Sequence, residues 1–175
     1  MGNKVIISAA LTGALTPKAK NANVPVTPQE IADDAYACWK EGAAVVHLHM
    51  RDENAMGTMD AKKFAETVKL IRAHEDCDVI INCTSSGDAK ATEETRKEHF
   101  LTVPGIEVGS YDIDTFNWDM MWTFENSAAF LQDLAKIYKE KGIRPEVEIF
   151  DEGMLTIARS YVERGILEKP VWCQF

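Results

Sequence analysis

Two kinds of hydrophobic pattern alternate along this chain. Short apolar runs rich in β-branched residues predict strands, and segments whose apolar residues recur every three to four positions predict amphipathic helices. The predicted strands are residues 5–11, 43–50, 78–83, 105–109, 145–150 and 170–175. The predicted helices are one that starts at residue 28, one that follows residue 60, and residues 91–100, 127–141 and 154–164. No linker or low-complexity segment interrupts the alternation, so residues 1–175 are expected to form a single domain.

Local signals mark where some of these helices begin and end. Thr27-Pro28-Gln29-Glu30 has the form of a capping box with proline at the first helical position. Asp60 can cap the second predicted helix. Gly142 follows the fourth predicted helix and is a candidate for the residue that ends it. His74 and His99 stand on polar helical stretches, so both imidazoles are expected at the surface.

The alternation predicts the fold class. Strands and helices that follow one another at a spacing of roughly 30 residues indicate right-handed βαβ units and a parallel sheet. A doubly wound sheet would usually open with a glycine-rich turn, but Thr12-Gly13-Ala14 leads into a long loop without the G-x-G-x-x-G pattern. A TIM (β/α)8-type barrel is therefore preferred. Because a complete barrel typically needs about 250 residues, the chain is expected to be truncated, with only about the first five to six βα units.

The charge balance limits the partners. With 28 acidic and 19 basic residues the chain has a net charge of −9, which argues against nucleic acid or an anionic membrane surface. No apolar stretch reaches the length of a membrane-spanning helix, and residues 1–12 lack a persuasive signal-peptidase site. The four cysteines show no C-x-x-C pair, as is typical of buried thiols in a reducing compartment. We therefore expect a cytoplasmic enzyme that acts on small soluble metabolites.

A His-x-His pair lies near the end of the second predicted strand. Side chains alternate between the faces of a strand, so His47 and His49 point to the same side, with Cα atoms about 7 Å apart. Two such imidazoles can bind one divalent ion, and barrel active sites lie at this end of the strands. The alternative is a pair of hydrogen-bonded core histidines. Arg51 and Asp52 follow, and they are expected either to orient the two ligands or to form a plain salt-bridged loop.

Polar residues also mark the ends of three other strands. In a barrel the carboxyl ends of parallel strands meet, so these side chains are expected to share one site with the two histidines. Each of them alone is equally well explained as a helix cap or a turn residue. The residues of this set are Thr84, Ser85, Ser110, Asp112 and Glu148.

The alternation of side chains along the fifth predicted strand bears on whether Glu148 lines the site. Glu146 and Glu148 share one face, whereas Val147 and Ile149 share the other. Charged side chains are rare on an inner face unless a ligand or partner compensates them. Either Glu148 lines the site or the glutamate face looks toward the helices, and the first interpretation is preferred.

Five motifs lie in order along the chain. They are Ala-Leu-Thr-Gly-Ala at 10–14, Val-Pro-Val-Thr-Pro-Gln-Glu-Ile-Ala at 24–32, Gly-Ala-Ala-Val-Val-His-Leu-His-Met-Arg-Asp at 42–52, Asn-Cys-Thr-Ser-Ser-Gly at 82–87, and Pro-Glu-Val-Glu-Ile-Phe-Asp-Glu-Gly at 145–153. In these motifs the chain resembles the β-keto acid cleavage enzymes, a family that includes the 3-keto-5-aminohexanoate cleavage enzyme of lysine fermentation.

The resemblance implies a zinc-dependent TIM barrel that condenses a β-keto acid with acetyl-CoA, giving acetoacetate and a new acyl-CoA. A homo-oligomer and a part in lysine degradation are also expected. The roles implied are zinc ligands for His47 and His49, and catalytic hydroxyls for Thr84, Ser85 and Ser110. The implied substrate-binding carboxyls are Asp112 and a glutamate that falls on Glu146 or Glu148, of which Glu148 is preferred.

Two departures limit what the resemblance implies. In the family, the glutamate that completes the zinc site, the adjacent aspartate base and a nearby arginine belong to late strands that these 175 residues lack. Leu15 stands where the aminohexanoate enzymes have a glutamate suited to an ammonium group. The alternatives are a non-catalytic metal-binding fragment or subunit, and a metal-dependent aldolase or hydrolase barrel, since such barrels also carry H-x-H on an early strand.

Overall fold

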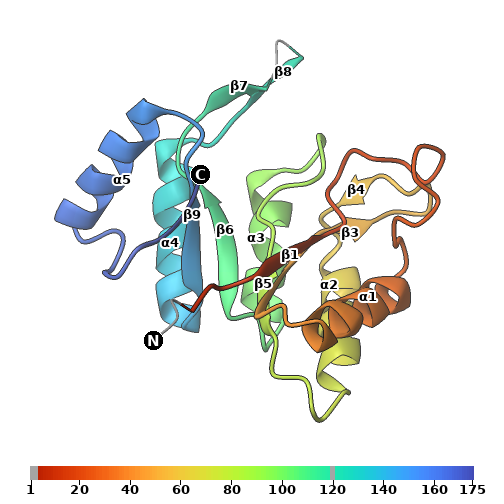
Figure 1. Ribbon diagram of the computed structural model, residues 1–175. Helices are drawn as coiled ribbons and strands as arrows, with labels where there is room; N and C mark the ends of the chain where they lie inside the picture. Colours follow the sequence, from red (N-terminus) through yellow and green to blue (C-terminus); the bar gives the residue numbers. More distant parts are fainter. Residues whose placement is uncertain (1–3, 119–120) are drawn as a thin grey trace. The chain divides into compact units, whose positions relative to one another are not determined.

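The computed structural model describes residues 4–118 and 121–175, in which strands and helices alternate apart from two short antiparallel hairpins (Figure 1). The chain divides into two units, Met1–Glu107 and Val108–Phe175. Each unit contains three parallel strands connected through helices.

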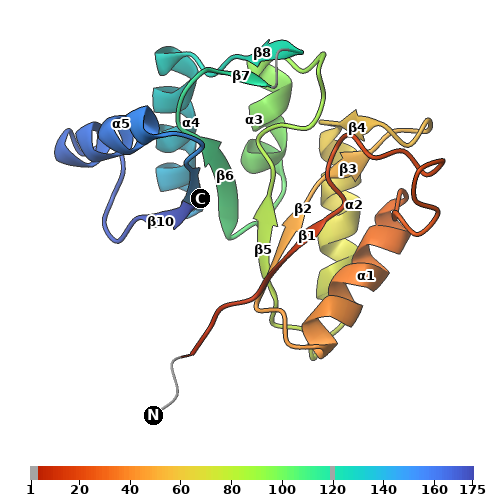
Figure 2. The same ribbon diagram turned by 45° about the horizontal axis from the view of Figure 1, so that its top comes forward.

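The first unit holds the first three βα repeats. Its elements are β1 (Ser8–Leu11), α1 (Pro28–Lys40), β2 (Val45–Leu48), β3 (Met50–Arg51), β4 (Gly57–Thr58), α2 (Ala61–Arg72), β5 (Ile80–Cys83) and α3 (Glu93–Thr102). Strand β2 lies between β1 and β5 and pairs in parallel with both. Helices α1 and α2 pack against each other, and α1 also contacts β1 and β2 (Figure 2). The antiparallel hairpin β3–β4 follows directly after β2.

The predicted helix caps are present. The Thr27 hydroxyl accepts from the Glu30 N–H at 3.2 Å, and Glu30 Oε2 accepts from the Thr27 N–H at 2.9 Å, which completes the capping box of α1. Asp60 caps α2 by accepting from the Lys62 N–H at 2.9 Å. These contacts span four residues or fewer, so the sequence was sufficient to predict them.

The prediction that His99 lies at the surface is wrong. Its side chain is fully buried, with ring centroids 4.1 Å from Phe64 and 3.8 Å from Phe100. Burial lowers the pKa of His99 to about 3, so at neutral pH the imidazole is uncharged and packs as an aromatic ring. The residues that precede His99 in α3 are polar and suggested exposure. The ring of His99 is buried against Phe64 of α2, which is distant in the sequence.

The second unit continues the alternation. Its elements are β6 (Val108–Asp112), β7 (Phe116–Trp118), β8 (Trp122–Phe124), α4 (Ala128–Lys141), β9 (Arg144–Glu148), α5 (Glu152–Glu163) and β10 (Trp172–Gln174). Strand β9 pairs in parallel with β6 on one side and β10 on the other. As predicted, Gly142 ends α4 in the left-handed conformation, with φ of +71°.

Strand β6 begins later in the chain than predicted. The expected strand was 105–109, whereas Gly105 has φ of +87° and belongs to the turn that follows α3. Ser110 and Asp112 consequently lie within β6 and not after it. The aromatic hairpin β7–β8 was not predicted at all.

None of the helices formed by residues 4–118 and 121–175 is long and apolar enough to cross a membrane.

Candidate active site

The two histidines at the end of β2 converge on one point. His47 and His49 are half-buried, whereas Val46 and Leu48 on the other face of the strand are fully buried. The two Nε2 atoms lie 3.1 Å apart. Two nitrogens that each bind a tetrahedral zinc ion at about 2.0–2.1 Å stand about 3.4 Å apart. The pair therefore fits a shared divalent ion with little movement.

The protonation state of His49 also suits a metal. Burial, followed by the charges of His47 and Arg51, lowers the pKa of His49 from 6.5 to about 3. Neutral imidazole is the form that binds metals. At pH 7 His49 therefore has no extra proton to lose before an ion binds.

Two glycines make room for the His49 ring. Gly87, in the loop after β5, has φ of +124°, and a Cβ there would lie 2.9 Å from His49 Nδ1. At Gly57, in β4, a Cβ would lie 1.7 Å from the Gly87 carbonyl oxygen and 2.9 Å from the Ala14 Cβ. A side chain at either position would displace a loop or the imidazole. The loops that follow β1 and β5 thus meet β4 beside His49.

Arg51 and Asp52 bond to loop atoms and not to the imidazoles. The fully buried Arg51 side chain donates five hydrogen bonds, to oxygens of residues 12–16 and Ala55. Asp52 Oδ1 accepts from two backbone N–H groups of its own turn. Any orientation of His47 and His49 by Arg51 therefore acts through the loops.

The residues at the end of β5 are buried, and the Thr84 hydroxyl bonds within its own turn. The Thr84 hydroxyl donates to the Ser86 carbonyl at 2.9 Å and accepts from the Ser86 N–H at 3.0 Å. The Ser85 carbonyl accepts from Arg96 Nε at 2.7 Å. The Thr84 hydroxyl thus stabilises its own turn, a structural role that was not predicted from the sequence. The backbone of Ser85 is held by a hydrogen bond from α3.

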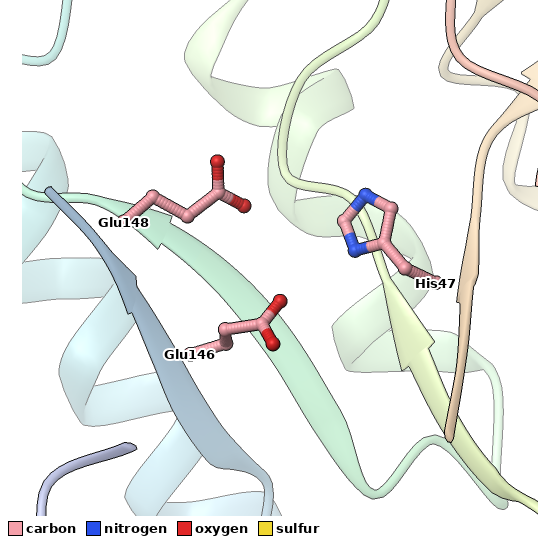
Figure 3. Close-up of side chains that lie close together, drawn as sticks. All are labelled: His47, Glu146 and Glu148. Carbon is pink, nitrogen blue, oxygen red and sulfur yellow. The ribbon is translucent and has the colours of Figure 1, made fainter. Parts of the chain in front are cut away.

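In the second unit, carboxyl groups gather on β6 and β9. Strand register pairs Ser110 with Glu146, and Asp112 with Glu148. Ser110, Asp112 and Glu146 are buried and Glu148 is half-buried. Figure 3 shows the Glu146 and Glu148 side chains leaving the same side of β9, and it also draws His47 of the first unit. The alternation read from the sequence therefore holds within β9.

Glu148 is protonated at neutral pH. Burial raises its pKa from 4.5 to about 9, and the charge of Asp112, a hydrogen bond with Asp112 and the charge of Glu146 act in the same direction. Two carboxyl groups can form a hydrogen bond only when one of them carries a proton. The raised pKa of Glu148 therefore lets its carboxyl donate to Asp112.

This raised pKa predicts how stability depends on pH. A carboxyl whose pKa is higher in the folded state stabilises the fold fully below its unfolded pKa of 4.5, and the contribution is lost as the pH rises toward 9. The Glu148→Gln variant has no proton to lose. In metal-free protein we expect its melting temperature to match the parent near pH 5 and to exceed it by several degrees at pH 9.

The matched control is Glu140→Gln, which removes an exposed carboxylate of α4. This variant should keep the pH dependence of the parent. Parallel melting curves for Glu148→Gln and the parent from pH 5 to 9 would contradict a buried, protonated Glu148.

Several residues that shape the candidate site were not among the site residues predicted from the sequence. Trp172 Nε1 donates to Glu146 Oε1 at 3.0 Å, which fixes a second carboxyl on the Glu148 face. The alternation of β9 was the available signal for Glu146. Gly57 and Gly87 gave no signal, because glycine is common in turns for reasons unrelated to a site.

The repeating strands and helices, with polar side chains at the carboxyl ends of the strands, define a (β/α)-barrel protein. The chain matches a solved complex of ObcA with oxaloacetate at a TM-score of 0.81 and 24% identity, covering 90% of this chain and 38% of that one. This confirms the predicted fold class, a TIM-type barrel of which the chain supplies the first part. The chain belongs to the β-keto acid cleavage enzyme family, whose family model matches residues 4–175.

Two relatives illustrate the membership. The 3-keto-5-aminohexanoate cleavage enzyme of Fusobacterium nucleatum is 35% identical over 100% of this chain, which covers 63% of that enzyme. The 3-dehydrocarnitine:acetyl-CoA trimethylamine transferase of Rhizobium meliloti is 32% identical over 99% of this chain, which covers 64% of it. The chain thus spans less than two thirds of the length of these relatives.

Proposed function

We propose that these 175 residues are part of a zinc-dependent β-keto acid cleavage enzyme, which condenses a β-keto acid with acetyl-CoA to give acetoacetate and a new acyl-CoA. The observation that carries the proposal is the 3.1 Å approach of His47 Nε2 to His49 Nε2 in a chain of this family. The names of two relatives support the co-substrate, a 3-dehydrocarnitine:acetyl-CoA and a 3,5-dioxohexanoate:acetyl-CoA transferase.

His47 and His49 would hold the zinc, and the family resemblance places the third protein ligand in a later strand. When bound, the zinc would supply Lewis-acid chemistry to a 1,3-dicarbonyl substrate. The two imidazoles would keep their positions because β2 holds their backbone and the loops around Gly57 and Gly87 confine the His49 ring. The low pKa of His49 keeps its nitrogen available over the whole neutral range.

We propose that the polar side chains at the ends of β5, β6 and β9 act on the substrate, because barrel enzymes place their active sites at the carboxyl ends of their strands. The hydroxyls of Ser85 and Ser110 would donate hydrogen bonds to substrate oxygens that gain charge, and Thr84 would hold the turn beside them. The Asp112–Glu148 pair would bind substrate with one donor, the protonated Glu148, and one acceptor. None of these residues is proposed as the general base, because the resemblance implies a base in a later strand.

The proposed reaction exchanges the acyl group of the β-keto acid for the acetyl group of acetyl-CoA. The substrate C2 carbon loses a proton and forms a bond to the acetyl carbonyl carbon, and the CoA thiolate leaves. The thiolate then bonds to the original keto carbon, the bond between that carbon and C2 breaks, and C2 regains a proton. The products are acetoacetate and the CoA thioester of the remaining acyl group.

Isotope tracing with the protein completed by its C-terminal strands tests this function. When the carbonyl carbon of acetyl-CoA carries ¹³C, the label should appear at the keto carbon of acetoacetate and not in the new acyl-CoA. Label in the acyl-CoA, or no acetoacetate from any β-keto acid with folded, zinc-loaded protein, would refute the proposal. An aldolase or hydrolase would consume the keto acid without acetyl-CoA.

The same assay with several β-keto acids tests the substrate class. Leu15 is exposed and lacks the charge that would attract an ammonium group, so neutral or carboxylated β-keto acids should react faster than 5-amino-3-ketohexanoate. A clear preference for the amino substrate would overturn this inference and support a part in lysine degradation.

We also propose that the protein is a cytoplasmic homo-oligomer. The net charge of −9 and the four free thiols support the location.

A further inference from the structure

The side chain of Arg51 bonds mainly to the loop that follows β1. Its Nε donates to the Thr12 hydroxyl at 2.9 Å, and its Nη2 donates to the Thr12 carbonyl at 2.8 Å. Its Nη1 lies 3.1 Å from the Thr16 carbonyl, 3.3 Å from the Ala14 carbonyl and 2.8 Å from the Ala55 carbonyl. Four of these five bonds reach back over 35 to 39 positions of the chain.

The acceptors of all five bonds are neutral oxygens, although Arg51 is fully buried. A buried guanidinium is tolerated only where oriented oxygens replace its hydration. The carbonyls of residues 12–16 must therefore point inward for the charge to be stabilised. The loop oxygens consequently stabilise the buried guanidinium charge, and the guanidinium in turn holds the loop in one conformation. Lysine, with a single nitrogen, cannot reproduce these contacts.

The loop held in this way lies beside the His49 ring. The His49 N–H donates to the Leu11 carbonyl at 2.7 Å, directly before the loop, and the Gly57 N–H donates to the Ala14 carbonyl at 3.2 Å. The Ala14 Cβ lies 3.7 Å from where a Cβ on Gly87 would stand, and Gly87 packs on the His49 ring. The next residue after Ala14 is Leu15.

We infer that Arg51 is a positioning residue for substrate selection. It fixes residues 12–16 beside His49, where Leu15 is exposed, so that this loop would meet the substrate from a fixed place. The part that concerns substrate rests on the proposed function, whereas the ordering of the loop does not. Substrate preference then depends on Arg51 although its side chain is buried against the loop.

Proteolysis of the full 175-residue chain tests the ordering of the loop. Endoproteinase Lys-C can cut after Lys18 and Lys20, which lie just beyond the loop, and after Lys90, an internal reference elsewhere in the unit. In Arg51→Ala we expect cleavage at Lys18 and Lys20 to be at least 10-fold faster, with Lys90 unchanged. Millimolar guanidinium chloride should restore the parent rate, and Arg51→Lys should stay fast.

The matched control is Arg96→Ala, which removes another buried guanidinium, one that donates to the Ser85 carbonyl. It should leave cleavage at Lys18 and Lys20 slow. If folded Arg51→Ala is cut there at the parent rate, Arg51 does not order the loop. If cleavage rises equally at all three lysines, or guanidinium fails to restore it, the role is one of general stability and the inference is wrong.

The completed, zinc-loaded protein tests the effect on substrate. Arg51→Ala should retain the parent zinc content, and its KM for the preferred β-keto acid should rise at least 10-fold with a smaller change in kcat. Its preference between neutral and amino substrates should shrink. Unchanged KM and preference in a variant with a disordered loop would refute the selection role. Absence of turnover in the parent itself would instead refute the proposed function.

Discussion

Joining these 175 residues to the C-terminal strands of the Fusobacterium nucleatum relative should raise the rate of acetoacetate formation by about 10²–10⁴ or more over the chain alone. The family resemblance assigns the aspartate base to those strands, and general-base catalysis by itself contributes a factor of this size. The third zinc ligand would arrive with the same strands. The measurement is acetoacetate produced from a β-keto acid and acetyl-CoA, with equal zinc loading of the two proteins.

The control is the same fusion with the added aspartate replaced by asparagine, which restores the zinc site without the base. It should bind zinc and remain near the rate of the chain alone. Equal rates for the chain alone and the complete fusion would show that the base lies within residues 1–175, and the assignment of roles would be wrong.

Replacing both His47 and His49 by alanine should lower zinc affinity by more than about 100-fold. Loss of an outer-shell partner already weakens metal sites by 10–100-fold, and this change removes two direct ligands. Elemental analysis after dialysis against zinc-buffered solution measures the effect, with circular dichroism to establish that the variant is folded.

His74→Ala serves as the control, because His74 stacks on Tyr36 with ring centroids 3.9 Å apart and is not part of the strand-end pair. It should keep the metal content of the parent. A double variant that keeps its zinc would contradict the assignment of both ligands.

Local signals predicted the helices well because the groups involved are close in sequence. The capping box of α1, the Asp60 cap of α2 and the glycine that ends α4 each depend on a few consecutive residues. The faces of β2 and β9 were equally accessible, since alternation along a strand needs no knowledge of its neighbours.

Features that depend on distant residues were predicted poorly. The start of β6 follows from its register with β9, which pairs Val108 with Arg144. Glu107, just before β6, accepts from the Ile81 N–H and thereby fixes the turn at a later position than the apolar pattern indicated. His99 is buried by Phe64, 35 positions earlier, and nothing in the local sequence of α3 reported that contact.

The candidate site shows the same division. Residue types and strand ends predicted the convergence of His47 and His49, which the structure confirms as an approach of 3.1 Å. In the sequence Arg51 stands close to His49. The hydrogen bonds from Arg51 to residues 12–16, however, involve a loop that begins 39 positions earlier in the chain. The effect of Asp112 on the pKa of Glu148 likewise depends on which residues β6 and β9 align.

The crowding of Ala14 against Gly57 and Gly87 sets a rule for redesigning this scaffold. Leu15 is exposed, so a library at that single position can explore charge and size without disturbing the packing. A larger side chain at position 14 would have to fit beside Gly57 and Gly87, which leave room for the His49 ring. Grafted loops that alter substrate range should therefore keep the small residue at 14 and the oxygens that Arg51 requires, and vary only the side chain that follows.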